Sequence, residues 1–327
     1  MDRVKRYVSE NEVPLFLRAK IETEEFVNEQ MPTPKGGVYI GCIKDVVYQR
    51  EKAEEGFSEA QTWLGTAYRY GLYGVEKDND EAFKWLKKAA DQKNIEAQCE
   101  LGLMYYYGKG MPKNAEKAIK LWLEAIDKGN ADSYEYFSRI YLFLGYSYDD
   151  GDGVKKNSKE AVKWYKKSAE LGELGAVAEL GIHYYEGDGV VKDEEKAKKY
   201  FIKAAEGGDA IAQYYLGCMY VENEDEMDIE KFLYWMEKAA AQKLAAAYTQ
   251  LGMSYIFDLE KVTEGLELLE KAAKEDEPHA IAFLGIMYYK GEIIERNEAK
   301  GIKLLQKAAK LGIEEAQGTL EENGLSW

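Results

Sequence analysis

Proline and cysteine are both scarce in this chain of 327 residues. Three of its 5 prolines lie within the first 34 residues, so the remainder is nearly free of the residue that interrupts helices. The 3 cysteines, Cys42, Cys99 and Cys218, are odd in number and far apart. That spacing excludes a disulfide framework and a closely spaced metal-ligand set, and it favours a reducing compartment.

Long apolar runs are also missing. No stretch approaches the roughly 18 apolar residues that span a bilayer, and the first twenty residues lack the apolar core of a signal peptide. We therefore expect a soluble, cytoplasmic protein. The net charge of −16 argues against a nucleic-acid or anionic-membrane surface and favours neutral or basic partners. An apolar content of 46% and 26 tyrosines argue against disorder.

A repeated pattern fills most of the chain. A leucine–glycine pair recurs seven times, and its glycines are 37, 43, 36, 36, 35 and 33 residues apart. A tyrosine follows each glycine by three residues, which places leucine, glycine and tyrosine on one helical face. The glycines are Gly65, Gly102, Gly145, Gly181, Gly217, Gly252 and Gly285.

A second helix follows in each repeat, with a small residue at offset 7, a large residue at offset 3 and, in every repeat but the fifth, a small residue at offset 0. We expect the small residues to allow close helix approach and the large residue to fill the space to the next repeat. The large residues are Trp85, Leu121, Trp164, Tyr200, Trp235, Leu268 and Leu304. A glycine inside a helix costs about 1 kcal/mol, so the first-helix glycines indicate that a facing helix needs their room.

The ends of the array are less regular. Residues 1–44 form a non-repeat segment with a predicted helix over 15–29, and the solenoid is expected over 45–327. It comprises an incomplete repeat at 45–56, seven repeats at about 57–312 and a cap at 313–327. The third repeat has about seven extra residues, within 130–143, which predict a first helix about two turns longer. Repeats five and six lack turn glycines, so their turns should differ.

The pattern resembles the Sel-one-like repeat family, a relative of the tetratricopeptide repeats, and the segments 178–190 and 199–205 match it closely. The resemblance covers about residues 57–322. It implies an all-α fold, a right-handed superhelical solenoid whose first helices line a concave groove. It also implies an adaptor or scaffold, and bacterial members include immunity proteins for secreted toxins. The branch with a disulfide in each repeat is a poor match, because no repeat here has two cysteines.

Candidate chemical motifs favour structural explanations. The acidic turn at 149–153 lacks the spaced ligands and final glutamate of a calcium loop. The glycine pairs join helix to helix and so differ from dinucleotide fingerprints. His183 and His279 have no nucleophile nearby in sequence. We expect no metal, no cofactor and no enzymatic activity.

By analogy with tetratricopeptide geometry, the positions one, four and five residues after each glycine, and three before it, point into the groove. Their aromatic and acidic side chains suit a partner with apolar anchors and lysine or arginine. An alternative is that many of them pack against neighbouring helices. The groove residues proposed are Arg69, Tyr70, Tyr106, Tyr107, Tyr146, Asp149, Tyr185, Glu186, Tyr214, Glu222, Phe257 and Tyr289.

The sequence therefore predicts a non-enzymatic module that binds a protein or peptide, which the acidity suggests is basic. An immunity or inhibitor protein that neutralises a basic toxin domain is the alternative. A hydrolase is a distant third possibility, because it would need a converging nucleophile and base.

Overall fold

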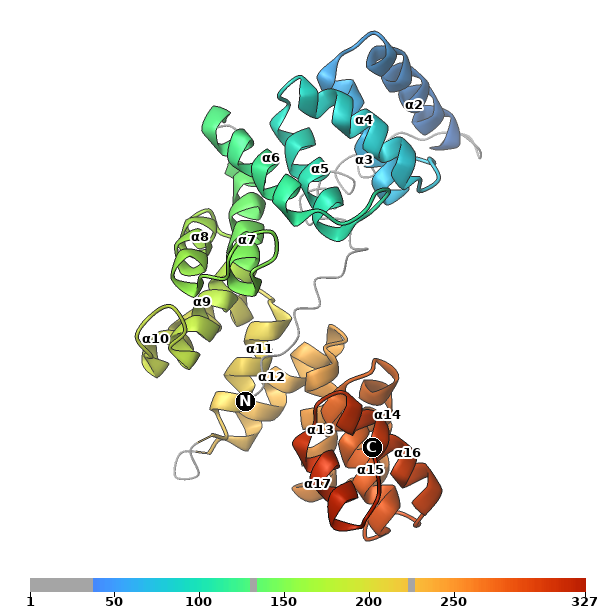
Figure 1. Ribbon diagram of the computed structural model, residues 1–327, viewed down its shortest axis with the longest axis vertical. Helices are drawn as coiled ribbons and strands as arrows, with labels where there is room; N and C mark the ends of the chain where they lie inside the picture. The colour runs from blue at the N-terminus through green and yellow to red at the C-terminus, as the bar shows by residue number, and fades with distance from the viewer. Residues whose placement is uncertain (1–37, 130–133, 223–226) are drawn as a thin grey trace. The chain divides into compact units, whose positions relative to one another are not determined.

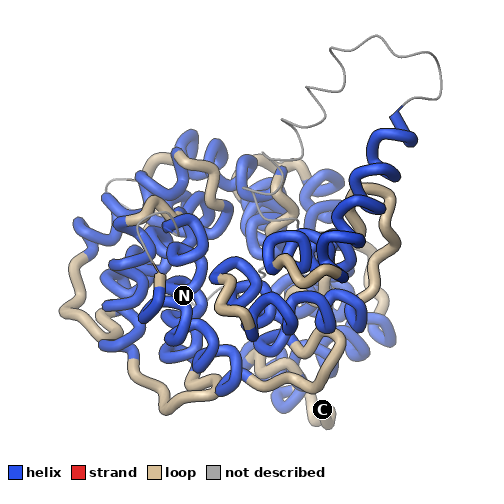
Figure 2. Tube along the Cα trace, turned by 90° about the horizontal axis from the view of Figure 1, so that it is seen from above, coloured by secondary structure: helices blue, strands red, loops and turns tan. Residues whose placement is uncertain are grey.

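The computed structural model describes residues 38–129, 134–222 and 227–327, and it does not describe the predicted helix at 15–29. Over the described residues the chain forms sixteen helices and no strand. The helices are joined by short loops (Figure 1, Figure 2). This arrangement confirms the predicted all-α solenoid of helix pairs.

The helices alternate between first and second members of each repeat. The first helices are α3 (Ser58–Tyr70), α5 (Ile95–Tyr107), α7 (Tyr134–Asp150), α9 (Leu174–Glu186), α11 (Ala210–Met219), α13 (Ala245–Phe257) and α15 (Pro278–Lys290). The second helices are α4 (Asn79–Asp91), α6 (Ala115–Lys128), α8 (Ser158–Glu170), α10 (Glu194–Glu206), α12 (Ile229–Ala241), α14 (Val262–Lys274) and α16 (Glu298–Lys310). Helices α2 (Val38–Glu54) and α17 (Glu314–Glu322) flank them.

The chain divides into two compact units, and the boundary falls inside α9, between Ala176 and Val177. The first unit holds α2 to α8 and the loop 187–191, and the second holds the rest of α9 and α10 to α17. In both units each first helix packs against the second helix of its own repeat. Second helices also contact the first helix that follows, so each unit is a stack of helix pairs.

The repeated glycine of the first helix lies against a large side chain of the second helix in the same repeat. A Cβ atom on Gly102 would lie 2.1 Å from Nε1 of Trp122, and one on Gly181 would lie 2.6 Å from the ring of Phe201. The glycine is therefore required for close approach, as the sequence predicted. The side chains that face the seven glycines are Leu86, Trp122, Tyr165, Phe201, Met236, Leu269 and Leu305.

These side chains stand one position after the large residues singled out from the sequence. In the first two repeats the predicted position contacts the preceding repeat, where the sequence placed it toward the next. Trp85 packs with Ala53 of α2, and Leu121 packs against the cluster that contains Ala82 of α4. The assignment was wrong because two adjacent large residues on one helix differ by 100° and serve two separate contacts.

A backbone hydrogen bond closes the helix pair in every repeat. The residue that caps the second helix donates its N–H to the carbonyl of the tyrosine three residues after the glycine, for example Asn114 to Tyr105 at 2.8 Å. In six repeats the cap is Asp or Asn, whose side chain accepts from the helix backbone. In several repeats a lysine ammonium from the start of the second helix also lies over the ring of this tyrosine, as Lys300 does 3.7 Å from the ring centre of Tyr288.

The first helix of the third repeat is longer than its neighbours, but over the described residues it is extended by less than predicted. Helix α7 has 17 residues where α3, α5 and α9 have 13, which is about one turn rather than two. Residues 130–133 lie outside the described part. The sixth turn differs from the glycine turns as predicted, because Glu260 adopts the left-handed conformation with φ of 55°. Most of the fifth turn, 223–226, is not described.

We predict that Gly102→Ala lowers stability by about 1–3 kcal/mol, because Trp122 is fully buried and has no room to retreat. The matched change is Gly318→Ala in α17, where no atom lies within 4 Å of the added Cβ. That change should raise stability by up to about 1 kcal/mol through helix propensity. Urea denaturation followed by circular dichroism measures both, and an unchanged or higher midpoint for Gly102→Ala would contradict the packing argument.

Candidate functional site

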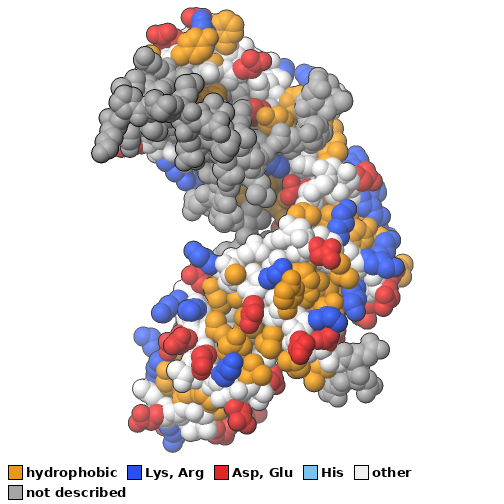
Figure 3. Space-filling model, turned by 180° about the vertical axis from the view of Figure 1, so that it is seen from behind, with side chains coloured by type: hydrophobic (Ala, Val, Ile, Leu, Met, Phe, Trp, Pro, Cys, Tyr) orange, Lys and Arg blue, Asp and Glu red, His pale blue; other side chains and the backbone are white. Residues whose placement is uncertain are grey.

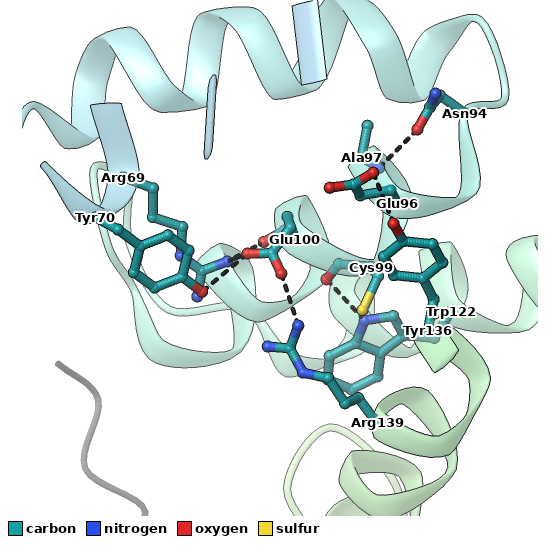
Figure 4. A network of polar contacts seen from close by, with 10 residues as sticks. All are labelled: Arg69, Tyr70, Asn94, Glu96, Ala97, Cys99, Glu100, Trp122, Tyr136 and Arg139. Atoms are coloured by element: carbon teal, nitrogen blue, oxygen red, sulfur yellow. Dashed lines mark hydrogen bonds and ion pairs between the residues drawn. The ribbon is translucent and has the colours of Figure 1, made fainter. Parts of the chain in front are cut away.

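The first helices of the first unit form an inner row, α3, α5 and α7, in which each helix contacts the next. Polar side chains join the three helices laterally (Figure 4). Arg69 comes from α3, Glu100 from α5, and Arg139 from α7. The inner row therefore carries a chain of charges that runs across three repeats.

Glu100 is the centre of this network and is 1% exposed. Its carboxylate accepts hydrogen bonds from Nη1 of Arg69, from the hydroxyl of Tyr70 at 3.0 Å and from Nη1 of Arg139 at 2.8 Å. Arg69 also donates to the Glu100 carbonyl at 2.8 Å. Burial alone would raise the pKa of Glu100, but the two guanidinium groups outweigh it and hold the pKa below its ordinary value.

The neighbouring residues of α5 extend the network. Glu96 accepts a hydrogen bond from the hydroxyl of Tyr136 in α7 at 2.8 Å. Nε1 of Trp122 donates to the carbonyl of Cys99 at 3.3 Å. Cys99 is buried, and burial raises the pKa of its thiol to about 12. A thiol in that state is a packing group, not a nucleophile.

An aromatic cluster continues the inner row beyond the charges. Tyr106 lies 5.5 Å from Phe143 of the next repeat, measured between ring centres, and 5.8 Å from Trp122. Tyr107 stands edge-on to both Tyr106 and Phe143. Tyr146 packs edge-on against Phe143 as well, and it is buried. These proposed groove residues therefore also form the packing between repeats.

In the first unit, the proposed groove residues therefore have different structural roles. Arg69 and Tyr70 hold Glu100, and the three tyrosines at 106, 107 and 146 lie in the aromatic cluster. Asp149 is buried. Sequence reasoning missed Glu100 and Arg139. The feature of the sequence that could have revealed Glu100 is its position between Ala97 and Leu101, on the part of the helix that packs against its neighbours.

The second unit brings some of its proposed groove residues together and leaves others apart. The hydroxyl of Tyr185 donates to Glu222, and burial together with that carboxylate raises the pKa of Tyr185. Tyr214 is buried, while Phe257 is 56% exposed. Glu186 is exposed, and Tyr289 packs against the cluster around Leu305. Tyr185 and Tyr214 also both pack against the ring of Tyr215, so three of the proposed groove residues of this unit belong to one cluster.

A cavity of about 570 Å³ opens beside α3 in the first unit. Helix α2, the loop after α3 and the start of α5 complete its walls. Its lining includes the aromatic rings of Tyr48, Phe57, Trp63 and Tyr73, and the charged or polar residues Lys52, Glu59, Thr66, Asn94 and Glu96. Because Glu96 also bonds Tyr136, the cavity adjoins the polar network of the inner row.

Comparisons with known proteins agree with this architecture. A family model of the Sel1 repeat matches residues 58–94, 95–130, 141–173, 175–209, 210–244, 245–277 and 278–313. The chain belongs to the Sel1 repeat family. The resemblance seen in the sequence is thereby confirmed, and Sel1 repeat proteins are protein-interaction scaffolds.

Solved structures show the same fold. A Sel1 repeat protein from Oxalobacter formigenes is 36% identical, with a TM-score of 0.59, and the match covers 67% of this chain and 89% of that one. The protective antigen c5321 of uropathogenic Escherichia coli strains is 29% identical, with a TM-score of 0.60. That match covers 86% of this chain and 60% of the antigen.

Curated relatives match over shorter segments. The chitin synthase regulator SKT5 of Saccharomyces cerevisiae is 39% identical over 88 residues, which is 27% of this chain and 12% of the relative. The ERAD-associated E3 ubiquitin-protein ligase component HRD3A of Arabidopsis thaliana is 37% identical over 65 residues, 20% of this chain and 10% of the relative. The chain thus spans only about a tenth of the length of these relatives. Among the described helices, none combines the length and apolar character needed to cross a membrane.

We predict that Glu100→Gln destabilises the protein by about 3–5 kcal/mol at pH 7, because the buried Arg69 and the partly buried Arg139 lose the carboxylate that pairs them. The control Glu81→Gln removes an exposed partner of Lys84, bound at 2.6 Å, and should cost less than about 1 kcal/mol. Chemical denaturation of the three proteins gives both values. Equal losses for the two variants would refute the central role of Glu100.

The stabilities of the wild type and of Glu100→Gln should also depend differently on pH. Because the folded-state pKa of Glu100 is depressed, its contribution is complete above the unfolded-state pKa of about 4.3 and declines as the pH falls through the folded-state pKa. The stability gap between the wild type and Glu100→Gln should therefore be constant from pH 6 to 8 and shrink below about pH 4. Denaturation midpoints across that range measure the gap, and a gap that widens in acid would contradict the assignment.

Proposed function

We propose that this chain is a non-catalytic interaction module that binds an extended segment of a partner protein along the inner row of α3, α5 and α7. The observation that supports this most is the cavity of about 570 Å³ beside α3, which adjoins the polar network through Glu96. Membership of a family of interaction scaffolds is consistent with it. The other proposed groove residues, from Arg69 to Tyr289, remain candidates for contacts along the same series of first helices.

The chemistry of the inner row suits protein recognition better than catalysis. Its central charged groups are paired to one another and largely buried, so they hold the first helices together and do not form a reactive centre. Its rings supply large contact area at low entropic cost. His279 lies on the second unit, where Nδ1 is 3.1 Å from Oε1 of Glu277, the residue that caps α15. That contact gives His279 a structural role at a helix end.

A second candidate is an immunity or inhibitor protein that covers a basic toxin domain. The observation in its favour is the net charge of −16, which would speed association with a basic partner. On the face shown in Figure 3, however, acidic and basic side chains are interspersed over the described surface. A single acidic field of the kind that steers a basic domain does not appear there, so we rank the peptide-binding module first.

Selection from a displayed peptide library against the full chain tests the proposal. Bound peptides should slow hydrogen exchange in α3, α5 and α7, while the second helices α4, α6 and α8 serve as the internal comparison. A peptide that protects only the second helices, or a selection that enriches nothing, would reject the inner row as the binding surface.

A further inference from the structure

The cavity beside α3 lies where the repeat pattern leaves a place for one more first helix. Helix α2 holds the place of a second helix, because Tyr48 precedes Trp85 by one period of 37 residues. The second helices α4, α6 and α8 each pack against the first helix of their own repeat. The corresponding first helix of α2 is not among the helices that the structure describes.

The wall that α2 contributes presents a position that elsewhere contacts a first helix. Gln49 lines the cavity at the position that Leu86 holds in the next repeat. Leu86 faces the first helix of its own repeat so closely that a Cβ atom on Gly65 would lie 2.6 Å from its Cγ. Gln49 therefore stands where a first helix belonging to α2 would be contacted.

The wall that α3 contributes presents positions that elsewhere contact the preceding first helix. Glu59 and Trp63 line the cavity, six and two residues before the repeat glycine. Arg139 and Phe143 hold the same two positions in α7. Both contact α5, the first helix before them, through the ion pair with Glu100 and through ring packing. The cavity thus lies between two faces that each bind a first helix in the following repeats.

Two further features indicate what surface an occupant should have. Thr66 lines the cavity and is 5% exposed, yet its Oγ1 has no hydrogen-bond partner among the described residues, which is unfavourable for a buried hydroxyl. The rings of Tyr48 and Phe57 also line the cavity and are 56% and 57% exposed. An apolar face that carries one hydrogen-bonding group would match both features.

The segment 15–29, predicted from the sequence to be helical, has such a face. On a helix its apolar and small side chains share one side and include a single hydroxyl; they are Leu15, Phe16, Ala19, Thr23, Phe26 and Val27. Charged side chains lie on the opposite side, at Arg18, Glu22, Glu25 and Glu29. The small residues Ala19 and Thr23 allow close approach to rings, and Thr23 supplies a partner for the Thr66 hydroxyl.

The chain between this segment and α2 also fits a helix pair. Residues 30–37 form a connection equal in length to 71–78, which joins α3 to α4. They include Pro32, Pro34, Gly36 and Gly37, which are turn-forming residues. A connection this short holds the segment near α2 at an effective concentration on the order of millimolar, so even a weakly favourable contact is populated.

We propose that residues 15–29 are the first helix of the α2 repeat and that they dock with their apolar side in the cavity beside α3. The docked helix borders the start of the inner row, so a partner segment that enters the cavity must displace it. The docking stands on the repeat register and on the connection length. Its regulatory consequence rests on the proposed function.

Hydrogen exchange of the full chain tests the docking. Amides of 15–29 should exchange at least about tenfold more slowly in the wild type than in Ala19→Asp, which places a charge in the apolar face. The matched control is Arg18→Asp, which introduces the same residue on the opposite side and should retain the protection. The indole N–H resonance of Trp63, assigned with Trp63→Phe, should shift in Ala19→Asp only. Equal exchange of 15–29 in the wild type and in Ala19→Asp would overturn the proposal.

Variants on the cavity side locate the contact. Phe57→Ala removes an exposed ring of the cavity and should speed exchange in 15–29 at least about threefold. Tyr234→Ala removes a ring that is 50% exposed but lies outside the cavity, and it should leave that exchange unchanged. Equal effects of the two variants would place the segment elsewhere and refute the docking. Protection that increases with protein concentration would assign the helix to a second copy of the chain and overturn the intramolecular contact.

The regulatory consequence has a separate readout. Peptides selected against the full chain that protect α3, α5 and α7 should bind Ala19→Asp at least about threefold more tightly than the wild type, because no helix has to be displaced. Equal affinity for the two proteins would refute the competition. If no peptide is selected, the proposed function fails, whereas protection of 15–29 would still support the docked helix.

Discussion

Close contact between a first-helix glycine and a large second-helix side chain is what joins the two helices of each repeat. The contact is tight enough that a single methyl group would collide with Trp122 or Phe201. A short helix cannot bury its apolar face alone, so each helix depends on its partner and on the neighbouring repeats. The backbone bond from the second-helix cap to the tyrosine carbonyl then sets where the second helix begins.

Because other residues make the contacts within each helix pair and between successive pairs, the residues of the inner row can serve other purposes. The residues at the glycine contact bind the two helices of a repeat, and Trp85 and Leu121, one position earlier, bind the repeat before. The inner row's lateral contacts can therefore be polar. A buried ionic cluster is usually no more stabilising than an apolar one of equal volume. Glu100 with its two arginines is thus better explained as a device that fixes the register of three first helices than as a source of stability.

The sequence was sufficient to predict the fold, because the leucine, glycine and tyrosine recur at fixed offsets and the same helix–helix packing recurs in every repeat. The sequence did not show which of Trp85 and Leu86 faces the first-helix glycine. Both side chains are large, and their directions differ only by a rotation of 100° about the helix axis. Glu100 and Arg139 could not be paired from the sequence either, because they lie 39 residues apart in different repeats and meet only through lateral stacking. The cavity was equally hidden, since three helices and a loop build it.

The position of the cavity follows from the repeat register itself. Tyr48 precedes Trp85 by one period of 37 residues, so the two rings hold equivalent places on α2 and α4. Trp85 is 7% exposed because it packs into the preceding helix pair, whereas Tyr48 is 56% exposed and lines the cavity. The first matched repeat begins at residue 58, so Tyr48 stands before the periodic stacking starts. The equivalent ring of Trp85 thus joins two neighbouring helix pairs, whereas the ring of Tyr48 forms a wall of the cavity that another molecule can contact.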